Sequence, residues 1–274
     1  MIPDISVLFV CVNYNSYRQL DNFLLSILTA YNKYVGHSES KLTIKVVVAD
    51  NSAEYSQVCT DTFPFPVVQY QTKANAGYLG GVTRARAALG LDFSEWNFSV
   101  ISNVDVNVSA DFFSNLAGHV GNNGVGCIAP AIISRQTHSD RNPKLLVRTP
   151  KRNLQIMKFL FSFPVLYKLK TKISSGKMRG SGDTERDIYA AHGSFMIFTD
   201  AFARFLNSFE FPSFLFCEEI YFAEHLAQAG LHTRYVPSIV ISDMDHQSTG
   251  KMKFSSYCRM NKDSIRMIMK NYYR

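Results

Sequence analysis

The first half of this chain alternates between apolar segments of strand character and longer segments with helical spacing. Apolar, β-rich runs cover Ile5–Val12, Leu42–Ala49 and Val67–Gln71, and a segment of helical spacing, Tyr17–Lys33, separates the first two. Strands joined through helices pair in parallel, so this order predicts an α/β fold with a mostly parallel central sheet flanked by helices. Ligands of such sheets bind at the carboxyl ends of the strands, where we expect the functional residues.

The alternation continues along the chain. Further predicted elements are a helix at Gly81–Leu91, a strand at Phe98–Ser102, a helix at Asp111–Val120, strands at Val125–Ile133 and Tyr189–Thr199, a helix at Glu218–Ala229, a strand at Thr233–Ile241 and a basic amphipathic tail at Tyr257–Tyr272. With 274 residues, 46% of them apolar, the chain can bury one large core. We expect a single domain, 1–274, in four parts: 1–133, 134–188, 189–250 and 251–274.

Targeting signals are not visible in the sequence. The longest apolar runs, Ile5–Val12 and Met157–Tyr167, are too short to span a bilayer, and the start of the chain lacks the basic region of a signal peptide. The five cysteines are odd in number and show no C-x-x-C spacing, which is typical of reduced thiols. We therefore expect a cytoplasmic protein.

The net charge of +7 arises from one segment between Lys144 and Arg179. That segment holds ten cations and no Asp or Glu, whereas the rest of the chain has 19 basic and 22 acidic residues. A nucleic-acid-binding face would spread its cations over several elements, so we expect no nucleic-acid partner. Since apolar residues from Met157 to Tyr167 interrupt the cations, the segment fits either an anionic membrane surface or a solvated insertion.

Each predicted strand of the first half leads into a short polar motif. These motifs are Asn13-Tyr14-Asn15, Asp50-Asn51-Ser52, the glycine-rich Asn75–Gly81 and Asn103-Val104-Asp105. One such motif alone is more typical of a turn or a helix cap than of a binding site. Four of them in order along one α/β pattern indicate a ligand site at this edge of the sheet.

Together these motifs resemble those of the family 2 glycosyltransferases with the GT-A fold, of the bacterial polysaccharide and rhamnosyltransferase-like kind, from Val7 to about Ser248. The resemblance implies a Rossmann-like sheet, a nucleotide-sugar-binding half (1–133), a basic variable insertion (134–188), an acceptor and catalytic half (189–250) and a basic helical tail (251–274). It also implies that Asn13 and Tyr14 lie along the nucleotide and that Asp50 contacts its base or ribose. Asn75, Gly77 and Gly81 would lie over the nucleotide, and Thr83 stands where the family often has a second Asn.

The Asn103-Val104-Asp105 motif resembles the family's D-x-D element in its N-x-D form. A nucleoside diphosphate leaves with growing negative charge, which Mn²⁺ or Mg²⁺ held by oxygen ligands can neutralise. The resemblance implies Asp105 as metal ligand, with Asn103 beside it and phosphate and water completing the coordination. The alternative is a strand-end Asp in a turn.

The second half resembles the acceptor side of the family. His192 and Gly193 belong to a small-residue segment before the acceptor pocket, and Phe214–Glu219 matches an E-D element at the start of a helix. The motif position implies Glu219 as the base that takes the proton of the acceptor hydroxyl, with Glu in place of the family's Asp. Glu218 would be structural or an acceptor contact, and the alternative for the pair is stabilisation of the helix N-terminus.

A metal-facing His usually follows the next strand in the family. Here spacing from Pro237 places Asp243 at that position, and His246 lies three residues later. We rank Asp243 first and His246 second as the additional metal ligand.

The resulting hypothesis is a metal-dependent, inverting hexosyl- or deoxyhexosyltransferase. It would move a sugar from a nucleotide-sugar donor to a bacterial surface-glycan acceptor (O-antigen, capsule or lipopolysaccharide), free or lipid-linked, on the inner face of the cytoplasmic membrane. Two alternatives remain open: a nucleotidyltransferase of a related fold, and a non-catalytic carbohydrate-binding or scaffold subunit.

Overall fold

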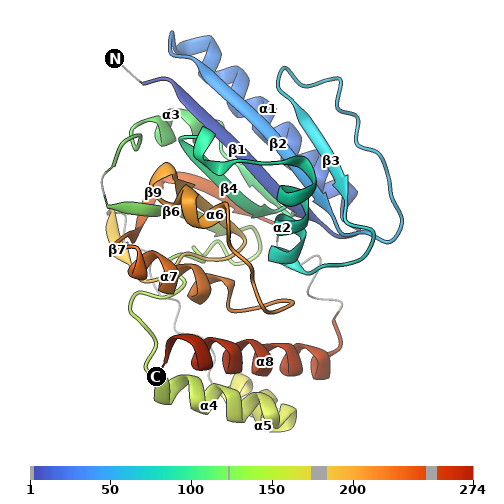
Figure 1. The fold of residues 1–274 in the computed structure, drawn as a ribbon, viewed down its shortest axis with the longest axis vertical. Helices are drawn as coiled ribbons and strands as arrows, with labels where there is room; N and C mark the ends of the chain where they lie inside the picture. The colour runs from blue at the N-terminus through green and yellow to red at the C-terminus, as the bar shows by residue number, and fades with distance from the viewer. Residues whose placement is uncertain (1–2, 123, 174–183, 245–251, 274) are drawn as a thin grey trace.

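A computed structural model of the chain describes residues 3–122, 124–173, 184–244 and 252–273 (Figure 1). Within these ranges one mixed sheet runs in the order β3-β2-β1-β4-β8-β6-β9-β5, with β7 paired to β9. Its strands are β1 Ile5–Asn13, β2 Leu42–Asp50, β3 Val67–Gln71, β4 Phe98–Asn103, β5 Val106–Val108, β6 Val125–Ser134, β7 Arg186–Ile188, β8 Phe195–Thr199 and β9 His232–Asp243. The main helices are α1 Tyr17–His37, α2 Tyr78–Leu89, α3 Phe112–Ala117, α4 Lys151–Ser162, α5 Pro164–Ile173, α6 Ala203–Leu206, α7 Glu218–Gln228 and α8 Phe254–Tyr272.

The N-terminal half of the sheet is parallel, as the alternation predicts. Strands β3, β2, β1 and β4 pair side by side in parallel. Successive residues of β1 enter different cores: Val7 and Phe9 pack with α1 and α3, whereas Leu8 and Val10 pack on the side of α2. A strand buried on both faces has a continuous apolar sequence, which explains the unbroken run at Ile5–Val12.

Beyond β4 the sheet is mixed. Strand β8 runs antiparallel to both β4 and β6, β6 and β9 are parallel, and β5 and β7 run antiparallel to β9. The predicted strand at Tyr189–Thr199 is shorter: β8 covers only Phe195–Thr199, after a turn at His192–Ser194 and the separate short strand β7. The prediction of a mostly parallel sheet therefore holds for the N-terminal half, because apolar patterns mark strands but not the direction in which they pair.

In its described part the basic segment forms α4 and α5, which pack with α8 as a layer at one end of the molecule (Figure 1). An aromatic cluster joins the three helices: the rings of Phe161 and Tyr167 lie 4.5 Å apart, and that of Tyr257 on α8 lies 6.0 Å from Phe161. Arg148 anchors the start of the segment through a two-pronged hydrogen bond to the buried Glu224 on α7, at 2.7 and 3.1 Å. The described part of the segment is thus packed against α7 and α8.

The described helices include none that is both long and apolar enough to cross a bilayer. All five cysteines are free thiols, and only Cys59 is exposed.

Candidate functional site

Three polar residues predicted at the strand ends lie side by side. Asn13 ends β1 opposite Asp50, which ends β2, and Asn103 at the end of β4 lies opposite Val12. The structure therefore brings the first, second and fourth polar motifs to one edge of the sheet. We call this edge, with the Asn75–Gly81 loop, the donor edge, after the nucleotide-sugar donor that its motifs predict.

Asp50 is the fully buried centre of the donor edge. One carboxylate oxygen accepts hydrogen bonds from Asn13 Nδ2 at 3.1 Å and the Ser52 amide at 3.0 Å. The other accepts from the Tyr17 hydroxyl and from Gln69 Nε2, both at 2.8 Å. Because both oxygens are used within the chain, Asp50 fixes the shape of this edge.

A hollow of about 400 Å³ lies directly beside this centre. Its lining includes Asn15, Tyr17, Ala53 and Glu54. Tyr17 joins the hollow to Asp50, because its hydroxyl bonds that carboxylate. Tyr14, predicted to lie along the nucleotide, is exposed on the same β1–α1 turn.

Asn51 holds the glycine-rich loop against the sheet. Its side chain donates to the Gly77 carbonyl at 2.8 Å and accepts from the Ala76 amide at 3.3 Å, while the Gly77 amide donates to Asn75 Oδ1 at 3.0 Å. Gly77 has a φ of +77°, and a Cβ there would collide with the backbone carbonyl of Phe214. The loop that begins α2 therefore touches the segment that leads into α7.

Asp105 lies in the turn between β4 and β5. Its side chain is 8% exposed, and its backbone carbonyl accepts from the Met244 amide at 3.0 Å. The backbone amide of Asn103, two residues earlier, donates to the Ser194 carbonyl at 2.9 Å. The predicted N-x-D motif thus meets both the end of β9 and the His192–Ser194 turn.

Tyr78, the first residue of α2, connects the two halves of the site. Its hydroxyl donates to the Gly193 carbonyl at 2.8 Å. Burial raises the pKa of this phenol well above its ordinary value, and the nearby carboxylates of Glu218 and Asp105 raise it further. The charges of the β4–β5 turn, through Asp105, and of the acceptor motif, through Glu218, thus both act on this phenol.

The two glutamates of the acceptor motif occupy different environments. Glu218 is buried and accepts from the Phe216 amide at 2.8 Å. Burial, and then the charge of Glu219, raise its pKa to about 8. Glu219 is more open: its Oε1 lies 3.7 Å from the Lys144 ammonium, and its Oε2 faces Gly193. The neutral form of the Glu218 carboxyl is thus favoured, whereas the Glu219 carboxylate lies beside the Lys144 ammonium.

The backbone before these glutamates is strained. Phe216 and Cys217 both adopt left-handed conformations, with φ of +74° and +66°, although neither is a glycine. Such conformations are costly and cluster at functional sites. This strain marks the start of α7 as a constrained site, and nothing in the sequence predicts it.

The His192–Ser194 turn is fixed by its own hydrogen bonds. The His192 amide donates to Asn142 Oδ1 at 2.7 Å, and its Nδ1 lies 2.9 Å from the Ser194 hydroxyl. Gly193 lies beside Glu219, since a Cβ there would be 3.9 Å from Glu219 Oε2. We call this turn, with Asn142, Lys144 and the two glutamates, the acceptor edge, after the role that its motifs predict; no motif marks Asn142 or Lys144.

The additional metal ligand stays a prediction. Asp243 is buried, and its carboxylate lies 3.0 Å from Nε of Arg141. It pairs with Val106 across β5 and β9, and the next residue, Met244, donates its amide to the Asp105 carbonyl, so the end of β9 lies beside the β4–β5 turn. His246 lies outside the described residues. In the described part of the chain, His, Cys, Asp and Glu form no group of three suited to a metal ion.

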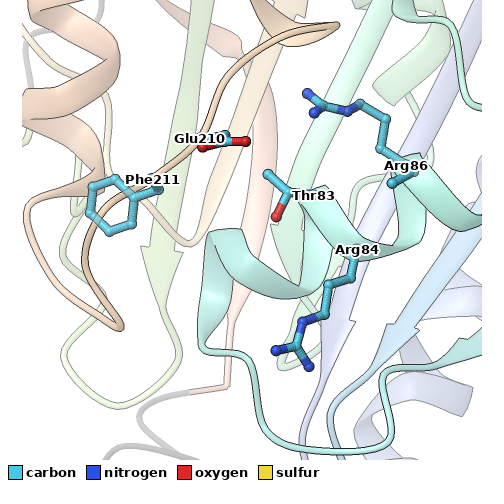
Figure 2. A pocket seen from close by; sticks show the side chains of 6 residues that line it. Thr83, Arg84, Arg86, Glu210 and Phe211 are labelled. Atoms are coloured by element: carbon cyan, nitrogen blue, oxygen red, sulfur yellow. The ribbon is translucent and has the colours of Figure 1, made fainter.

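Thr83 lies on the outer side of α2, where a hollow of about 370 Å³ separates this helix from Glu210 and Phe211 (Figure 2). The two arginines of the hollow are hydrogen-bonded within the chain. Arg84 donates to the Thr72 carbonyl at 3.2 Å, and Arg86 donates to the Leu206 carbonyl at 2.7 Å. This hollow therefore lies between α2 and the segment before α7.

No protein-family model and no curated protein sequence matches the chain. Among solved structures it is similar to GalNAc-T7 with UDP, GalNAc and Mn²⁺, at 10% identity and a TM-score of 0.52, over 93% of this chain and 47% of that one. It is also similar to the mannosyltransferase PcManGT from Pyrobaculum calidifontis in complex with GDP-Man and Mn²⁺, at 14% identity and a TM-score of 0.49, over 90% of this chain and 59% of that one. The chain thus spans about half the length of these neighbours, and it has the GT-A fold that its motifs predict.

Proposed function

We propose that this chain is a glycosyltransferase that moves a hexosyl or deoxyhexosyl group from a nucleotide-sugar to an acceptor hydroxyl. The observation that carries the proposal is the position of Tyr78, which begins α2 directly after the glycine-rich loop and donates to the Gly193 carbonyl of the acceptor segment. A sugar between these groups would have its leaving phosphate at Asp105 and its acceptor at Glu219. That order is the one that a single displacement with inversion requires.

The donor edge would bind the nucleotide. The hollow beside Tyr17 offers space for the base, next to the Asp50 centre that fixes Asn13. The first backbone amides of α2, after this loop, lie at a helix N-terminus, which favours phosphate. Asn13, Tyr14, Asn75, Gly77 and Gly81 keep their predicted roles in this proposal.

The donor set at the turn fits a divalent cation of the Mn²⁺ or Mg²⁺ type. Asp105 supplies a carboxylate and Asn103 an amide oxygen, both of them hard ligands, and donor phosphates would complete the set. When bound, the cation would neutralise charge that develops on the leaving diphosphate. The GT-A neighbours with Mn²⁺ support this assignment.

Glu219 would be the general base. It lies in the first turn of α7, where the helix dipole favours an ionised carboxylate, and Lys144 adds a positive charge 3.7 Å away. Glu218, with its raised pKa, would remain protonated at neutral pH and position the acceptor or the backbone of Phe216. Two carboxyls in contrasting environments can thus divide these tasks.

The acceptor in this proposal is a bacterial surface glycan, carried on a lipid at an anionic membrane surface. This finer assignment, with membership of family 2 and likeness to rhamnosyltransferases, is supported by the motif resemblance and by the basic segment next to the acceptor edge. In this proposal α4 and α5 would form the surface that meets the membrane.

Hydrolysis and transfer with a panel of nucleotide-sugars, with and without Mn²⁺, tests the proposed function. We expect Mn²⁺-dependent release of nucleoside diphosphate from one sugar class, lost in Asp105→Ala. Release of pyrophosphate from a nucleoside triphosphate and a sugar phosphate would instead favour a nucleotidyltransferase. Saturable glycan binding without turnover of any donor would favour the non-catalytic subunit.

A further inference from the structure

We propose that the outward face of α4 and α5 binds an anionic lipid surface. The two helices form the outermost layer at their end of the molecule, beyond α8 (Figure 1). The side chains of this layer carry the proposal, and only its link to a lipid-linked acceptor depends on the proposed function.

Helix α4 is apolar on two opposite sides. Leu154 and Phe161 are buried on the inner side, toward α8. Ile156 and Phe159 lie at helical spacing on the other side and are exposed. Phe163, directly after the helix, is also exposed, and its ring lies 5.0 Å from that of Phe159. A helix at a water-exposed surface needs only its inner stripe, so the outer stripe indicates a second apolar contact.

Helix α5 repeats this arrangement. Tyr167 points inward, with its ring 4.5 Å from that of Phe161, while Val165, Leu166 and Leu169 are exposed. The outer side chains of the two helices, Ile156, Phe159, Phe163, Val165, Leu166 and Leu169, are 44% to 74% exposed. We call these six side chains the apolar face.

Exposed cations accompany the apolar face along the same two helices, with no acidic residue among them in the sequence. The structure uses Lys144 and Arg148 inside the chain, as partners of Glu219 and Glu224. Lys151, Arg152 and Lys170 are exposed on α4 and α5, and no Asp or Glu occurs between Lys144 and Arg179. Lys177 and Arg179 lie outside the described residues.

This charge distribution selects the occupant. In a symmetric dimer through the apolar face, the cations of both copies would meet with no carboxylate between them, and the like charges would repel. An anionic lipid surface neutralises the same cations and accepts the apolar side chains at its interface. The apolar face and its cations therefore complement an anionic membrane rather than a second copy.

The layer also reaches the acceptor edge. Tyr257 on α8 packs against Phe161 and Tyr167 and against Phe216, whose ring centroid lies 5.1 Å away. Burial raises the pKa of the Tyr257 phenol, with smaller contributions from Tyr167 and, smallest of all, from the charge of Glu219. The inner side of this layer thus contacts the segment before the proposed base, so a membrane at the apolar face would hold the site near a lipid-linked acceptor, with the helical layer between them.

Co-sedimentation with vesicles tests the proposal. The full chain should bind vesicles of phosphatidylcholine with phosphatidylglycerol at low salt, bind more weakly as salt rises, and stay in the supernatant with phosphatidylcholine alone. The double variant Phe159→Ser/Val165→Ser should lower this affinity by about tenfold or more. The matched control Leu25→Ser/Val35→Ser removes exposed apolar side chains from α1 and should bind like the unchanged chain.

A second pair of variants tests the cations. Lys151→Glu/Arg152→Glu should abolish the preference for anionic vesicles, whereas Lys41→Glu/Arg204→Glu, with the same change in net charge at exposed positions outside the layer, should keep it. Circular dichroism verifies the fold of every variant.

Two results would overturn the proposal. One is equal recovery in the supernatant with both vesicle types at low salt, and the other is a dimer in light scattering that Phe159→Ser/Val165→Ser dissociates. Because donor hydrolysis is measured without vesicles, failure of membrane binding and failure of the proposed transferase are separate results.

Discussion

The donor edge and the acceptor edge of the site are built by opposite means. At the donor edge, amides, hydroxyls and one carboxylate satisfy one another around Asp50, which accepts from four donors. At the acceptor edge, two adjacent glutamates repel each other, one of them has a raised pKa, and two residues before them adopt left-handed backbone. The first arrangement suits rigid recognition, and the second suits proton transfer.

The largest expected effect concerns the turn that joins the two edges. Asp105→Ala should abolish the Mn²⁺-dependent part of nucleoside diphosphate binding, because it removes the proposed carboxylate ligand. Calorimetric titration with and without Mn²⁺ measures this. Asp61→Ala, at an exposed position, is the control. Unchanged Mn²⁺ dependence in Asp105→Ala would remove Asp105 from the metal site.

The next effect separates the two acceptor glutamates. Glu219→Gln keeps the shape of the side chain but removes its basicity, so kcat should fall by about 10²–10⁴-fold with little change in nucleotide affinity. Steady-state kinetics on the cognate donor would measure this. If Glu218→Gln shows the large loss and Glu219→Gln does not, the base is Glu218.

A third change tests the contact between the edges. Gly77→Ala introduces a Cβ against the Phe214 carbonyl at a left-handed position, and should cost about 2–5 kcal/mol of stability. The control is Gly36→Ala in α1, where an added Cβ would have no atom within 4 Å. This change should stabilise the fold by about 0.5–1 kcal/mol. Chemical denaturation compares the two. Equal midpoints would mean that the edges do not depend on this contact.

The pH dependence of stability isolates Glu218. Its pKa is raised on folding, so the folded chain retains a proton that the unfolded chain releases, and stability falls as pH rises from about 4.5 to about 8. Glu218→Gln removes this loss and still accepts from the Phe216 amide. The Tm of the variant should therefore exceed that of the unchanged chain increasingly over this range, and then by a constant amount. A constant difference from pH 4 to pH 8 would contradict the raised pKa.

The smallest effect concerns the helical layer rather than either edge. Arg148→Lys keeps the charge but loses the two-pronged bond to Glu224, so we expect a loss of about 1 kcal/mol, because Arg148 is half exposed. Faster proteolysis of α8 would accompany it, since Arg148 also bonds the Tyr272 carbonyl. Lys151→Arg, at an exposed site, is the control and should change neither quantity.

Much of the fold could be predicted from the sequence, because buried strands and amphipathic helices have distinct periodicities. The run at Val67–Gln71 coincides with β3, and Glu218 begins α7 as expected. The mixed second half could not be predicted, since pairing direction depends on contacts such as that between β4 and β8. The charge pattern of the sequence predicts Lys144 and Arg148 on a basic surface. Tertiary contacts instead place them beside buried or half-buried glutamates.

For the site, the polar motifs predicted which residues would gather at the strand ends. Asn13, Asp50 and Asn103 do lie together, because parallel strands in adjacent positions end at one edge. The roles of Asn51, Tyr78 and Lys144 depend on contacts between segments far apart in the chain. A tyrosine directly after a glycine turn is a weak signal in sequence, although in the structure it bridges both edges.

The contact of Gly77 with Phe214 has a kinetic consequence. The Asn75–Gly81 loop, which we propose lies over the nucleotide, contacts the segment that carries Phe216, Cys217 and the glutamates, because Gly77 lies against the Phe214 carbonyl and has no side chain to act as a spacer. Any shift of the loop when a nucleotide arrives is therefore passed to the strained turn before α7. If the chain is the proposed transferase, we expect the two substrates to bind in a fixed order, donor before acceptor. We also expect bound acceptor to slow hydrolysis of the donor by water.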